Sequence, residues 1–100
     1  MKTVTLHDIE AARERIAGKV ARTPTTQSAS LSELCGVPVH LKLESRQTTG
    51  SFKLRGASNA IASLTAQEKT HGVVAASTGN HGRALAYAAG LEGMRAIICM

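Results

Sequence analysis

The stretch GVVAASTGNHGRALAYAAG, residues 72–90, decides the fold class. Its first part, 73–77, is short, apolar and β-branched at its start, which is typical of a strand. Turn residues follow at 78–82, and the alanine-rich segment 83–90 predicts a helix that its last glycine ends. The apolar segment 95–100 predicts another strand. A strand, a glycine turn, a helix and a strand in this order predict a parallel α/β unit with a right-handed crossover.

A similar succession comes earlier in the chain. Residues 37–44, VPVHLKLE, alternate apolar and polar side chains, which predicts a strand with one buried face. After a loop, residues 51–64 predict a helix, capped by Ser51 or Thr49, whose apolar side chains form one stripe: Leu54, Ala57, Ile61 and Leu64. The fold class is therefore α/β with parallel strands. We expect both glycine-bearing loops at the carboxyl ends of strands, where ligands gather in such sheets.

The N-terminal part predicts two further helices. A Thr-x-x-Asp capping box at residues 5–8 precedes helical spacing of apolar residues, so we expect a helix over residues 7–17. Pro24 keeps the following RTPT segment extended. A short helix is expected over residues 30–34, ended by Gly36.

Composition limits the class of protein and its partners. The 100 residues are 43% hydrophobic and 19% charged, which is typical of one globular core. The net charge of +5 comes from dispersed Lys and Arg without aromatic interleaving, so we expect no nucleic-acid partner. No apolar stretch resembles a signal peptide or a membrane span. We expect Cys35 and Cys99 to be separate thiols in a reducing cytoplasm. The apolar run that ends at Met100 predicts that the chain is part of a longer protein.

TTGSFKLRGA, residues 48–57, places Lys53 at the start of the predicted helix. The partial positive charge of a helix N-terminus disfavours an ammonium group there, and a neutral amine is a nucleophile toward carbonyls. Phe52 beside it offers a flat apolar surface. This pattern predicts Schiff-base chemistry with an aldehyde cofactor, and the alternative is a lysine that only extends from the helix start into solvent.

STGNHG, residues 77–82, predicts an anion site. At a strand-to-helix junction, free backbone N–H groups and the helix dipole attract a carboxylate or a phosphate. The glycines permit close approach of a ligand, Ser77 and Thr78 supply hydroxyls, and Asn80 supplies an amide that can bond a ring oxygen. The alternative is an ordinary capped turn.

The motifs SFKLRGA and STGNHGRALA, with LKLE and RTP upstream, resemble the threonine dehydratase and serine racemase family of fold-type II pyridoxal phosphate enzymes. The resemblance covers essentially the whole chain and implies the α/β fold of tryptophan synthase β-like enzymes. RQTTGSFKLRGA and Arg83 resemble most the dehydratase subtype associated with hydroxyectoine utilisation.

The resemblance implies that pyridoxal 5'-phosphate is held on Lys53 as an internal aldimine and that Lys53 is also the base that removes the α-proton. Phe52 borders the cofactor ring and Asn80 bonds its 3-oxygen. The carboxylate of a small amino-acid substrate is received by Ser77, Thr78, Gly79 and His81. The implied reaction eliminates water from a β-hydroxy amino acid such as threonine or serine, giving a 2-keto acid and ammonia.

Two other functions stay open at this point. Racemases of the family place a serine hydroxyl at the position of Thr78 as an acid and base on the opposite cofactor face, so an amino-acid racemase is one alternative. The other is a non-catalytic module in which STGNHG binds an anion or a phosphate and Lys53 is a counter-ion. No metal site is expected, because the histidines share no ligand spacing: His7, His40 and His71.

The family pattern also divides the chain. Residues 1–72 are expected to begin a large cofactor domain, and residues 73–100 a small mobile domain. The phosphate cup and the partner of the pyridine nitrogen are expected beyond residue 100, so we expect this chain alone to be inactive and the full-length protein to form a homodimer or a higher homo-oligomer. No role is assigned to Arg55, which is expected to face solvent or pack across the loop, and the acidic residues of the first helix read as a solvated face.

Overall fold

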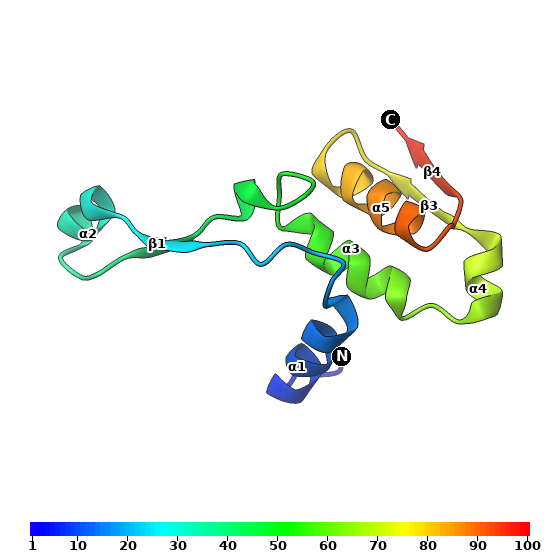
Figure 1. The fold of residues 1–100 in the computed structure, drawn as a ribbon, viewed down its shortest axis with the longest axis horizontal. Coiled ribbons are helices and arrows are strands. Elements are labelled where there is room, and N and C mark those ends of the chain that lie inside the picture. Colours follow the sequence, from blue (N-terminus) through cyan, green and yellow to red (C-terminus); the bar gives the residue numbers. More distant parts are fainter.

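The computed structural model describes all residues from 1 to 100. Along the chain, the elements are α1 (Leu6–Ile16), β1 (Thr25–Gln27), α2 (Ala29–Cys35), β2 (His40–Lys42), the 3₁₀ helix η1 (Glu44–Arg46), α3 (Lys53–Ala62), α4 (Ala66–His71), β3 (Val73–Ala76), α5 (Asn80–Leu91) and β4 (Ala96–Cys99). Figure 1 shows α3 and α5 side by side, β3 and β4 along the far side of α5, and an arm of β1 and α2 that extends away from them.

The core lies between α3 and α5. Leu54 and Ile61 of α3 are almost completely buried, as the predicted apolar stripe requires. The cluster is completed by Leu85 and by four alanines whose small side chains let the two helices approach closely: Ala57, Ala84, Ala88 and Ala89. Side chains from both strands β3 and β4, among them Val73 and Ile98, pack against this cluster. The core therefore holds the start of α3 and the start of α5 in one body.

The parallel pairing predicted for the C-terminal part is confirmed. β3 and β4 pair in parallel from Val73 opposite Ala96 to Ala76 opposite Cys99, and α5 connects them. The prediction that Gly90 ends the helix is wrong, because Gly90 is itself helical and α5 continues to Leu91. The chain instead turns at Gly93, whose φ of +66° is one that glycine tolerates best.

The prediction of a parallel strand over 37–44 is wrong. The observed strand β2 spans only three residues, all exposed, and it pairs antiparallel with β1. The chain reverses direction through the short helix α2 between β1 and β2, so the two strands run antiparallel. The resulting arm accounts for a radius of gyration of 16.2 Å, where a compact chain of this length has about 13 Å. The loop before Lys53 therefore does not follow a strand of the parallel sheet.

Local helix signals are confirmed where they were recognised. Thr5 caps α1 with its capping box, and Gly36 ends α2 in the left-handed conformation. The helix α4 was not predicted, although Thr65 and Glu68 form a second capping box at its start. None of the helices combines the length and the apolar composition that a membrane span requires. The division of the chain after residue 72 stays a prediction, and the core contains side chains from both parts.

Two glycines of α5 should respond oppositely to the same substitution. A Cβ on Gly82 would lie 2.7 Å from Cγ2 of Ile98, whereas a Cβ on Gly90 would meet nothing within 4 Å. We expect Gly82→Ala to lower the free energy of unfolding by about 1–3 kcal/mol through overpacking. Gly90→Ala should raise it by about 0.5 kcal/mol through helix propensity. Urea denaturation of both variants measures this difference, and equal effects would show that Gly82 is not pressed against β4.

Candidate functional site

Lys53 is the first residue of α3, and its side chain is exposed. The prediction that Ser51 or Thr49 is the N-cap residue of this helix is wrong. The N-cap residue is Phe52, which makes no side-chain cap bond, and Oγ of Ser51 accepts a 3.4 Å hydrogen bond from the Lys53 N–H. Nζ of Lys53 lies 5.2 Å from the centre of the Phe52 ring and makes no hydrogen bond or ion pair within the chain. The amine is therefore accessible to a partner outside the chain.

The turn from Ser77 to Gly82 joins β3 to α5 at the carboxyl end of β3, as predicted. Oγ of Ser77 accepts hydrogen bonds from the N–H groups of Gly79, at 3.3 Å, and Gly82, at 3.0 Å. Gly82 is buried, and a Cβ on it would lie 2.7 Å from Cγ2 of Ile98, so packing requires a glycine here. Three backbone N–H groups of the turn have no acceptor within the chain: those of Thr78, Asn80 and His81. These groups and the positive end of α5 suit an anion.

The core brings the two motifs together at the starts of α3 and α5. Lys53, Phe52 and His81 line a hollow of about 280 Å³, whose floor includes Leu85 of the core. The other turn residues line a second hollow of about 430 Å³ that shares the first turn of α5: Ser77, Thr78, Gly79 and Asn80. The structure thus brings His81 beside Lys53, and it places Asn80 in the second hollow.

These residues suit pyridoxal phosphate by the chemistry of their groups. The cofactor needs an accessible amine, a flat apolar neighbour and donors for negative oxygens. Lys53 supplies the amine, and Phe52, 61% exposed, supplies the flat apolar side chain. The free N–H groups at the start of α5 supply the donors. The roles assigned to the individual residues stay predictions.

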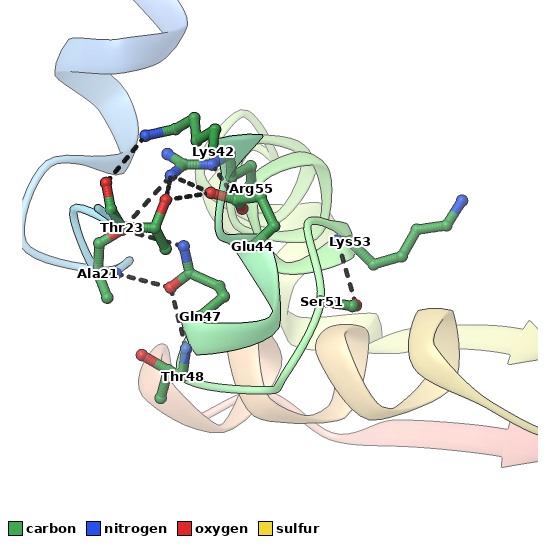
Figure 2. Close-up of polar contacts among 9 residues, drawn as sticks. All are labelled: Ala21, Thr23, Lys42, Glu44, Gln47, Thr48, Ser51, Lys53 and Arg55. Atoms are coloured by element: carbon green, nitrogen blue, oxygen red, sulfur yellow. Dashed lines mark hydrogen bonds and ion pairs between the residues drawn. The ribbon is translucent and has the colours of Figure 1, made fainter. Parts of the chain in front are cut away.

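A cluster of polar residues lies beside the start of α3, on the side away from the Lys53 side chain, and it was not predicted from the sequence (Figure 2). Arg55, for which no role was expected, donates from Nε and Nη2 to the two carboxylate oxygens of Glu44, at 2.9 Å and 2.8 Å. Oγ1 of the buried Thr23 donates to the same carboxylate at 2.5 Å. Mainly because of the Arg55 hydrogen bonds, the pKa of Glu44 falls to about 2. No periodicity in the sequence announces this pair, since its partners lie on opposite sides of a loop.

Residues 16–100 match the family model of the pyridoxal-phosphate dependent enzymes, so the chain belongs to that family. Its relatives define the group within it as that of the fold-type II threonine dehydratases and serine racemases. A Sinorhizobium fredii protein provisionally named a threonine dehydratase is 60% identical over the whole chain, which covers 30% of that protein. The serine racemase of Dictyostelium discoideum is 50% identical over 88% of the chain and 27% of the racemase.

Solved structures agree with this assignment. The structure of maize serine racemase superposes with a TM-score of 0.89 at 41% identity, over 97% of this chain and 30% of that one. The α/β fold is therefore that of fold-type II pyridoxal phosphate enzymes. The chain spans less than a third of the length of each of these relatives.

The Glu44 carboxylate should make stability depend on pH. A carboxyl whose pKa falls from 4.5 to about 2 on folding stabilises the fold above its ordinary pKa, and this contribution is lost as the pH falls toward 2. We expect Glu44→Gln to lower the free energy of unfolding by about 1–3 kcal/mol at pH 7. The gap between the two proteins should shrink from about pH 5 downward. Urea denaturation at several pH values measures it, and a gap that is constant with pH would refute the role of the charge.

Proposed function

We propose that this chain supplies the cofactor lysine and the carboxylate-binding turn of an enzyme that eliminates water from a β-hydroxy amino acid such as threonine or serine. The observation that carries the proposal is the single hollow lined by Lys53, Phe52 and His81, which joins an accessible amine to the start of α5. Relatives named L-threonine ammonia-lyase, 47% identical, and threonine dehydratase support this class of reaction.

Lys53 would hold pyridoxal phosphate through Nζ, Phe52 would border its ring, and Asn80 would donate to its 3-oxygen. The exposed Phe52 ring beside the lysine supports this assignment. When bound, the cofactor delocalises the electron pair that is left at the substrate α-carbon after deprotonation.

The turn before α5 binds the substrate carboxylate through the N–H groups of Thr78 and His81. Ser77 and Thr78 add hydroxyl donors, because Oγ of Ser77 accepts two N–H bonds and still has its own proton to donate. Gly79 belongs to the proposed set through the turn it forms, where its N–H donates to Oγ of Ser77. Lys53, once its amine is free, takes the α-proton of the substrate held between the two motifs. Loss of the β-hydroxyl as water and hydrolysis of the remainder give a 2-keto acid and ammonia.

The proposal includes features of the full-length protein. It assigns residues 1–72 and 73–100 to a large and a small domain and the whole protein to a homodimer or a higher homo-oligomer. It also includes a cytoplasmic location and the dehydratase subtype associated with hydroxyectoine utilisation.

Covalent attachment tests the role of Lys53. The full-length protein loaded with pyridoxal phosphate is reduced with borohydride, digested and mapped by mass spectrometry. We expect the cofactor mass on the peptide that contains Lys53 and on no other lysine peptide, and we expect Lys53→Ala to lose it. A phosphate-binding module with Lys53 as a counter-ion predicts no tagged peptide, and a tag elsewhere would equally contradict the assignment.

The exposed hydroxyl of Thr78 favours racemisation as a second activity, and the serine racemase relatives support it. Chiral analysis of products from L-serine and L-threonine separates the two reactions. We expect the keto acid as the main product. Ammonia is released after the β-hydroxyl is eliminated, and this release makes the reaction irreversible. Thr78→Ala should lower any formation of D-serine at least 10-fold and change keto-acid formation less. Production of D-serine without keto acid would reverse the order of the two activities.

A further inference from the structure

The loop between η1 and α3 is held by polar contacts. Five polar residues of the chain are buried, and four of them belong to this loop or to the segment it touches: Thr23, Gln47, Thr49 and Ser51. The Gln47 amide accepts from the Ala21 N–H at 2.7 Å and donates to the Ala21 carbonyl oxygen at 3.0 Å. A side chain that is 4% exposed thus ties the loop to the backbone after α1.

The Arg55–Glu44 pair closes this loop. The two residues lie 11 positions apart, one before the loop and one in the first turns of α3. Their two parallel hydrogen bonds fix the orientation of both side chains, which a single point contact does not do. Thr23 adds the bond to Glu44 described above. The start of α3 is therefore fixed in direction as well as in position.

The side chain of Lys53 makes no hydrogen bond or ion pair of its own, so its placement depends on the contacts that hold the start of α3. It precedes Arg55 by two residues in the same helix, and positions two apart point to different sides of a helix. Figure 2 shows Lys53 extending away from the polar cluster while Arg55 points into it. The Lys53 amine makes a cation–π contact with Phe52 and no polar contact with any other side chain. The position from which the Lys53 side chain extends is thus set by how the helix start is held.

We propose that Glu44 and Arg55 are positioning residues that aim Lys53 into the hollow it shares with His81. The inference rests on the proposed role of Lys53 as the cofactor lysine. It goes further by assigning a role to two residues that face away from that hollow. A displacement of a reacting group by about 1 Å costs on the order of 100-fold in rate, so a less firmly held helix start should lower kcat.

The test uses the full-length protein loaded with pyridoxal phosphate, in four variants. Glu44→Gln removes the charge, and Arg55→Lys keeps the charge and loses the paired geometry. Thr23→Val removes the hydroxyl that donates to Glu44 and accepts from Arg55. Glu92→Gln is the matched control, because Glu92 makes ion pairs of similar length with Lys19 and Lys69 outside the Lys53 hollow. Visible absorbance measures how much cofactor is attached, visible circular dichroism per attached cofactor measures its orientation, and kcat and KM are measured separately.

We expect Glu44→Gln to keep most of the attached cofactor, to lose at least half of its visible circular dichroism and to lower kcat about 10-fold or more with a smaller change in KM. Arg55→Lys and Thr23→Val should lower the visible circular dichroism and kcat by smaller factors, and Glu92→Gln should match the wild type in both. If Glu44→Gln does not fold, the other two variants carry the test.

Two failures are distinguishable. Unchanged circular dichroism and kcat in all folded variants would overturn the positioning role while Lys53 remains tagged by borohydride. An untagged Lys53 in the wild type would instead overturn the proposed function on which the inference rests. Effects of equal size in Glu92→Gln would overturn the positioning role, since they would show a general loss of stability.

Discussion

The close packing of α3 against α5 is the constraint on which the rest of the structure depends. Alanines at positions 57, 84, 88 and 89 bring the two helix backbones near each other, and Leu54 and Ile61 fill the space between them. Each helix begins with one of the two motifs, so their packing places Lys53 and His81 on the walls of one hollow. Local structure alone would not bring Lys53 and His81 together, because they lie on different helices.

Apolar packing positions the helices, and polar contacts orient their first turns. The alanine-rich core leaves little bulk to hold the loop before α3, and there Gln47 and the Arg55–Glu44 pair take over. At α5, the hydroxyl of Ser77 shapes the turn by accepting two backbone N–H groups. The site thus combines a rigid apolar scaffold with two polar turns that leave one amine and three N–H groups free.

Sequence reasoning succeeded where the signal is local. The capping box at residues 5–8, Gly36 and the apolar stripe of α3 each act within a few residues, so they were readable, and the capping box at Thr65 was equally readable although it was overlooked. The partner of β2 and the Arg55–Glu44 pair depend on how distant segments meet, which periodicity does not record. The two motifs were expected to lie together at the carboxyl ends of parallel strands, and that reason holds only for the turn after β3, because β2 pairs antiparallel with β1.

The most direct measurement of the central claim is a crystal structure of the full-length protein with pyridoxal phosphate. The account predicts continuous electron density from Nζ of Lys53 to the cofactor, with the ring between the start of α3 and the start of α5 and with Arg55 paired to Glu44. Density that joins the cofactor to another lysine, or a cofactor ring in contact with only one of the two helix starts, would contradict it.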